Sequence, residues 1–162
     1  MIVGVGVILY FDYIAEIGAP NKNKIVLSND RLDCNFADKN YESGQVFCVA
    51  NIATGLNLLF SLDDRCLVGA HVYNIDLDLL PQSEIELPDY IEGKVRARGC
   101  KHYYLKNCYF MDFRNDGLSY DRKNRLIAFG NLQDAYLTVR TCENLFVSLD
   151  DNSKLVAAVV CL

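Results

Sequence analysis

Residues 57–64 read Asn-Leu-Leu-Phe-Ser-Leu-Asp-Asp, and residues 144–151 read Asn-Leu-Phe-Val-Ser-Leu-Asp-Asp, so six of eight positions are identical. The similarity continues after the acidic pair, where Leu-Val-Gly-Ala at 67–70 corresponds to Leu-Val-Ala-Ala at 155–158. Each copy has the pattern of a strand, an Asp-Asp turn and a second strand. The repeat therefore predicts two related halves. The alternative is chance similarity, because hairpins in which an Asp-containing turn joins two apolar strands are common in β proteins.

The rest of the chain carries the same β character. Period-two alternation and runs of β-branched or aromatic residues recur along it, whereas helical periodicity is hard to find. The predicted strands are residues 1–11, 45–51, 56–62, 67–77, 84–87, 94–98, 102–113, 125–130, 135–141, 144–149 and 155–161. We expect an all-β fold, either an antiparallel β-sandwich or paired half-barrels. The expected organisation is one domain, residues 1–162, with related halves at 1–79 and 94–162 joined by a connection at 80–93.

Composition places the chain among globular proteins. Of its 162 residues, 51% are hydrophobic, and 21 acidic against 16 basic side chains give a net charge of -5. That balance excludes intrinsic disorder, which needs low hydrophobicity and high net charge. A chain of this length buries roughly 70% of the surface that its unfolded form exposes, so it needs neither a metal nor a disulfide for stability.

The N-terminus and the cysteines indicate a cytoplasmic protein. Residues 1–11 are apolar, but no basic residue precedes them and they are too short to span a bilayer, so we expect a buried strand. The seven cysteines form no regular disulfide framework. Most of them lie in or beside apolar runs, where a thiol behaves as a small hydrophobic side chain.

Candidate catalytic and metal-binding residues are few. Cys100, His102 and Cys108 lack the paired spacing of a structural zinc site. The carboxylates of Asp63 and Asp64 sit where a turn is expected, so turn chemistry explains them. We expect no metal, no cofactor and no enzymatic activity. A pocket converging on His71 or His102, with a carboxylate in hydrogen-bond reach, would revive the enzyme or small-molecule-binding hypothesis.

Charge is strongly polarised along the chain. Residues 63–92 contain eight acids and one base, a net charge of -7, and residues 94–125 contain nine bases and three acids, a net charge of +6. The acidic block is either a solvated face or the docking site of a basic partner. Six residues are the candidate partner-binding set: Asp76, Asp78, Glu84, Glu86, Asp89 and Glu92. Nucleic acid is not expected as a partner, because the protein is acidic overall.

Residues 144–159, Asn-Leu-Phe-Val-Ser-Leu-Asp-Asp-Asn-Ser-Lys-Leu-Val-Ala-Ala-Val, carry a resemblance. A small, acidic, mostly β chain with such hairpins resembles the immunity proteins of bacterial toxin systems, including those of contact-dependent growth inhibition. The resemblance implies a protein that binds and neutralises one cognate toxin domain, commonly a basic nuclease. It transfers no site residue.

A second hypothesis follows from the charge blocks alone. Residues 63–92 of one copy and residues 94–125 of another have opposite charge, so the chain is also a candidate for a two-fold homodimer that acts as a structural or assembly module. The sequence expects no membrane partner.

Overall fold

The computed structural model describes residues 10–15, 23–28, 31–36, 45–51, 54–98, 108–110 and 117–162. Nearly all regular structure in these residues is β-strand, which confirms the all-β prediction. The strands are β1 (Tyr10–Ala15), β2 (Asn23–Leu27), β3 (Arg31–Phe36), β4 (Val46–Ala50), β5 (Leu56–Ser61), β6 (Leu67–Tyr73), β7 (Tyr90–Arg98), β8 (Cys108–Phe110), β9 (Leu118–Asp121), β10 (Leu126–Gly130), β11 (Leu137–Cys142), β12 (Leu145–Leu149) and β13 (Leu155–Cys161), with the 3₁₀ helix η1 (Leu132–Asp134).

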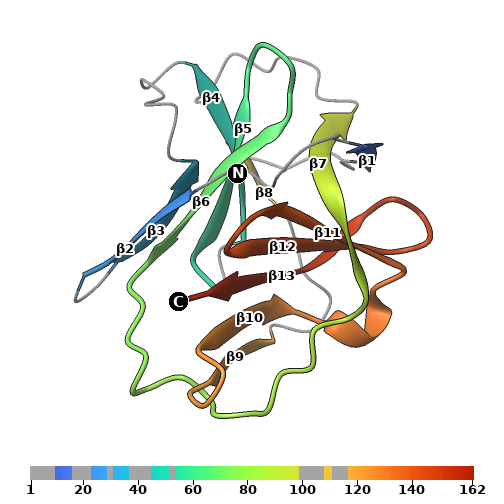
Figure 1. The fold of residues 1–162 in the computed structure, drawn as a ribbon. Coiled ribbons are helices and arrows are strands. Elements are labelled where there is room, and N and C mark those ends of the chain that lie inside the picture. The colour runs from blue at the N-terminus through green and yellow to red at the C-terminus, as the bar shows by residue number, and fades with distance from the viewer. Residues whose placement is uncertain are drawn as a thin grey trace, which may run out of the picture.

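Two sheets contain these strands (Figure 1). The seven-stranded sheet has the order β1-β7-β11-β12-β13-β10-β9, and the six-stranded sheet has the order β2-β3-β6-β5-β4-β8. The repeated stretch forms β5 in one sheet and β12 in the other. Around it the two sheets share one pattern, because β4-β5-β6-β3-β2 corresponds in order to β11-β12-β13-β10-β9. Pairing is antiparallel except that β8 runs parallel to β4, and β7 runs parallel to β11.

One hydrophobic core joins the two sheets. Phe60 of β5 is fully buried, with its ring centroid 5.4 Å from that of Phe47 in the same sheet. It also lies 5.7 Å from Phe11 of β1, which belongs to the other sheet. Val147 of β12 and Val160 of β13 belong to the same buried cluster. The fold is therefore a β-sandwich, with alternate side chains of each sheet filling the space between the layers.

The predicted strand at residues 84–87 is wrong. Residues 84–87 lie across the outer face of the seven-stranded sheet and form no strand or bridge. The isolated parallel bridge to this sheet lies just before them, between Gln82 and Tyr120. β7 begins at Tyr90, so the strand-free connection ends at Asp89 and not at residue 93. Of the expected strand at residues 1–11, residues 1–9 lie outside the described part of the chain. Tyr10 and Phe11 begin β1, which continues to Ala15. In the described part of the chain, no helix is both long and apolar enough to cross a membrane.

Candidate functional site

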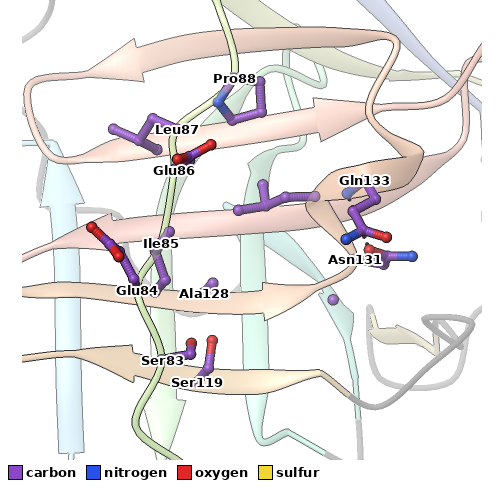
Figure 2. Close-up of a pocket in the computed structure, with 12 residues that line it drawn as sticks. Ser83, Glu84, Ile85, Glu86, Leu87, Pro88, Ser119, Ala128, Asn131 and Gln133 are labelled. Carbon is purple, nitrogen blue, oxygen red and sulfur yellow. Dashed lines mark hydrogen bonds between the residues drawn. The ribbon is translucent and has the colours of Figure 1, made fainter.

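Residues 74–89, which we name the acidic strap, connect β6 to β7 across the outer face of the seven-stranded sheet (Figure 2). Ile85 anchors the strap, because its side chain is only 7% exposed and packs into a second apolar cluster. That cluster contains Ala128 of β10, Phe146 of β12 and Val159 of β13, whose side chains face away from the main core. The strap is thus an apolar-anchored third layer over part of this sheet.

Asp121, at the end of β9, fixes the strap by hydrogen bonds. Its Oδ2 accepts from the backbone N–H of Ile85 at 3.1 Å and from the Nδ2 of Asn124 at 2.9 Å, and its Oδ1 accepts from the backbone N–H of Asn124 at 2.9 Å. The donation from Asn124, followed by that from Ile85, lowers the pKa of this carboxyl below its ordinary value of 3.8. An ionised Asp121 therefore ties the strap to the β9–β10 hairpin.

The structure divides the six predicted partner-binding residues into three groups. Asp76 and Asp78 are used within the molecule: Asp76 Oδ1 accepts from the backbone N–H of Asp78 at 3.0 Å, and Asp78 Oδ1 lies 2.7 Å from Arg122 Nη2. The ion pair is exposed on both sides, so it contributes little to stability. Glu84, Glu86 and Asp89 are exposed, and their carboxylates have no hydrogen bond or ion pair to any other described residue.

Glu92 belongs to a different environment. It lies in β7, and its Oε1 accepts from Arg140 Nη1 of β11 at 3.1 Å. The Arg140 guanidinium also lies 5.9 Å from the ring centroid of Tyr90 and 5.7 Å from that of Phe146. Glu92 Oε2 and Arg140 Nε are buried without a partner among the described residues. This half-buried pair separates Glu92 from the exposed carboxylates of the strap.

A basic strip runs along β7 on the same outer face, and we define it as Lys94, Arg96 and Arg98. Asp12 of β1 lies 3.2 Å from Arg96 Nη2 and 3.3 Å from Arg98 Nε. Phe146 shows that the strip and the acidic strap lie on one face of the sheet, because its ring contacts residues next to both. Its ring packs edge-on against Tyr90 of β7 on one side and belongs to the Ile85 cluster on the other. The strap and the strip, which are parts of the two charge blocks, thus lie on one face of the sheet.

A groove of about 620 Å³ opens between the strap and η1. Strap residues 83–88 form one wall, and Asn131, Leu132 and Gln133 form the opposite wall (Figure 2). Ser119 of β9 and Ala128 of β10 line it as well. Asp121 lines a second pocket of about 360 Å³ together with Arg122 and Lys123, and it does not line the groove. Ser83 and Glu84 of the strap line both hollows.

The outer face of the six-stranded sheet carries a cluster that sequence reasoning missed. Asp33 of β3 faces His71 of β6 in the sheet register, and its Oδ1 is in hydrogen-bond contact with His71 Nδ1. Arg31 Nε also donates to that oxygen at 2.7 Å, and its guanidinium lies 5.3 Å from the ring centroid of Tyr73. The sequence signal for this cluster was the spacing of Arg31 and Asp33, which are two residues apart and therefore share one face of a strand.

This cluster supplies the carboxylate that the enzyme hypothesis required, but neither pocket beside the strap contains His71. Cys100 and His102 lie outside the described residues, as does the side chain of Cys108. Within the residues that are described, no three His, Cys, Asp or Glu side chains are grouped to hold a metal ion.

Fold and site together define a β-sandwich whose outer face presents an acidic strap, a groove and a basic strip. Comparison with protein-family models and with curated proteins finds no match.

Proposed function

We propose that this chain is an immunity-type binding protein, which docks its acidic strap on a basic toxin domain and thereby neutralises it in the cytoplasm. The observation that carries the proposal is the state of Glu84 and Glu86. Both carboxylates are exposed and without a cation among the described residues, yet they flank Ile85, which is buried and bonded to Asp121. Charges held outward on an anchored segment are available to a partner at a low cost in conformational entropy.

The chemistry of the expected partner follows from the sign of this surface. A nuclease binds phosphates with Lys and Arg, so its active site is basic. Carboxylates on a fixed segment complement such a site, and complementary fields raise the association rate and the specificity. The immunity resemblance of the hairpin sequence implies the same kind of partner, a toxin domain.

Reversal of the strap charge tests the proposal. Where a toxin gene neighbours the gene for this chain, its toxin domain is purified and its affinity for the chain is measured by calorimetry; isolation from any such gene would count against the proposal. Glu84→Lys with Glu86→Lys is expected to weaken binding by about 100-fold and to abolish protection of cells, because two attractions become repulsions. Asp76→Lys with Asp78→Lys is a less direct test, since Asp76 accepts a hydrogen bond from the strap backbone and Asp78 forms an ion pair with Arg122.

The matched control is Asp63→Lys with Asp151→Lys, which changes net charge equally at the two hairpin turns away from the strap. These carboxylates are also exposed. The control pair is expected to alter affinity by less than about threefold. Equal losses in both double variants would show a response to net charge only, and unchanged binding in the strap variant would place the interface elsewhere.

A second candidate, a homodimeric assembly module, is favoured by one observation. The basic strip of β7 and the acidic strap, which leads into β7, lie on the same face of the sheet. A two-fold axis through this face would bring the strap of each copy onto the strip of the other. Light scattering at about 50 mM and about 500 mM salt tests this, because a charge-driven dimer is expected to dissociate at the higher salt. A monomer at both concentrations excludes it.

A further inference from the structure

We propose that the groove beside the acidic strap receives an extended, lysine- or arginine-bearing segment of the partner, which pairs with the strap backbone as an added β-strand. The inference rests on the proposed function and specifies how the same surface binds. It is drawn from three features of the strap: the direction of its backbone, the shape of the groove and the position of its charges.

The backbone of the strap has one side occupied and one side free. Ser83 donates its N–H to Tyr120 O at 3.2 Å, and Ile85 donates its N–H to Asp121, so both point toward β9 and its turn. In extended chain, the N–H and C=O groups of successive residues point to opposite sides, and those of every second residue point to the same side. Those of Glu84 and Glu86 therefore point away from Asp121. Neither residue makes a backbone hydrogen bond with another described residue.

The groove lies on that free side. Asp121 lines the pocket on the occupied side of the strap and is absent from the groove, whereas Asn131 and Gln133 form the groove's far wall. Figure 2 shows the same arrangement, with Asn131 and Gln133 across an opening from the strap. Its volume of about 620 Å³ is within the range of pockets that hold ligands of drug size. Strand addition to an exposed backbone edge is a general mode of peptide recognition.

The side chains around the groove select the kind of segment. Glu84 and Glu86 are two residues apart, so their carboxylates are about 7 Å apart along an extended chain. A paired strand repeats its own side chains at this interval, which places alternate Lys or Arg residues beside the two carboxylates. Ala128 and Leu132 give the groove an apolar part that suits small apolar side chains at the intervening positions.

The test uses two probe peptides on the full chain: acetyl-Lys-Val-Lys-Val-Lys-Val-amide and its counterpart with Glu in place of Lys. NMR titration is expected to shift the amide signals of residues 84–89 and 131–133 with the Lys peptide and not with the Glu peptide. Absence of shifts in these residues with the Lys peptide, or equal shifts with both peptides, would overturn the inference.

Backbone pairing is separated from charge by two variants of one residue. Glu86→Gln removes only the charge and is expected to weaken binding of the Lys peptide about threefold. Glu86→Pro removes the charge and the N–H, and is expected to weaken binding about tenfold further. Equal affinities of the two variants would refute strand pairing.

A modified peptide covers the case in which Glu86→Pro disturbs the strap itself. Methylation of alternate backbone nitrogens in the Lys peptide removes its donors and leaves the protein unchanged. One of the two methylation registers is expected to lose binding about tenfold, while the other retains it, because only one edge of an added strand faces the strap. Equal binding in both registers contradicts the inference. If the toxin domain still responds to Glu84→Lys with Glu86→Lys, the proposed function stands even though strand pairing fails.

Discussion

Replacement of Phe60 by alanine is expected to lower the free energy of unfolding by about 3–5 kcal/mol. The ring is fully buried, and it stacks on Phe47 of its own sheet while it contacts Phe11 of the other. Its loss removes apolar burial and leaves a cavity at the junction of the two sheets. This is a large part of the 5–15 kcal/mol that typically holds a domain folded.

Urea unfolding monitored by circular dichroism measures the Phe60 effect. Phe60→Leu keeps most of the volume and is expected to cost less than about 1.5 kcal/mol, so it remains measurable if Phe60→Ala is unfolded. Leu79→Ala is the control, because Leu79 is 81% exposed and its loss is expected to change stability by less than about 0.5 kcal/mol. A cost for Phe60→Ala close to that of Leu79→Ala would contradict the inter-sheet core.

Replacement of Asp121 by asparagine is expected to release the strap from the sheet. Both carboxylate oxygens accept hydrogen bonds, one from Asn124 N–H and the other from Ile85 N–H and Asn124 Nδ2. An amide offers only one acceptor oxygen, so a donor faces the NH₂ group whichever way the side chain turns. We expect the amide proton of Ile85 to exchange at least about tenfold faster and the Tm to fall by roughly 5 °C.

The same variant tests a pH dependence. Because the pKa of Asp121 is lower in the folded protein than its ordinary value of 3.8, the unfolded chain binds more protons between those two values. The stabilisation is present above the ordinary value and is lost as pH falls through the folded-state pKa. Asp121→Asn is therefore expected to lose less stability than the natural protein when pH is lowered below about 4. Parallel stability profiles in acid would show that this carboxylate does not hold the strap.

The two expected results concern different links between fold and binding. Phe60 holds the sheets together, and Asp121 holds the strap on one of them. If the strap is the docking segment, Asp121→Asn also weakens binding of the partner without touching Glu84 or Glu86, because the freed segment must be ordered again on association. The variant therefore connects the stability of the strap with the proposed function.

The central hairpins were predictable because their signal is local. β5, β6, β12 and β13 have continuous apolar character with short polar turns between them, and each was placed within a few residues of its observed ends, although the prediction for β6 extended to residue 77. Phe60 and Val147 both lie in the main core, but a continuous apolar run does not indicate which of its side chains face that core. Such strands lie in the middle of a sheet, where burial on both faces keeps the pattern clear.

The strands that sequence reasoning missed lie at or near sheet edges. β2 and β9 are the ends of the two strand orders among the described residues, and β3 carries Arg31 and Asp33 on its outer face. A short strand with charged residues on its solvent-exposed face has a composition like that of a loop, so it is hard to recognise from sequence. At residues 84–87 the opposite error occurred, because a strand was predicted where none forms. Polar and apolar residues alternate there as in a strand, but the segment crosses the sheet and has no neighbouring strand to pair with along its length.

The sequence by itself determined the all-β class, the repeated hairpin and the separation of acidic from basic residues, because composition, alternation and charge are properties of neighbouring positions. Only the tertiary structure decided which of those charges face outward without a partner. Asp78 meets Arg122 and Glu92 meets Arg140 across 44 and 48 positions, whereas Glu84 and Glu86 meet no cation among the described residues. Ion pairing between residues far apart in the sequence depends on how the strands and the strap pack in space. A local sequence pattern does not show which distant residues will meet.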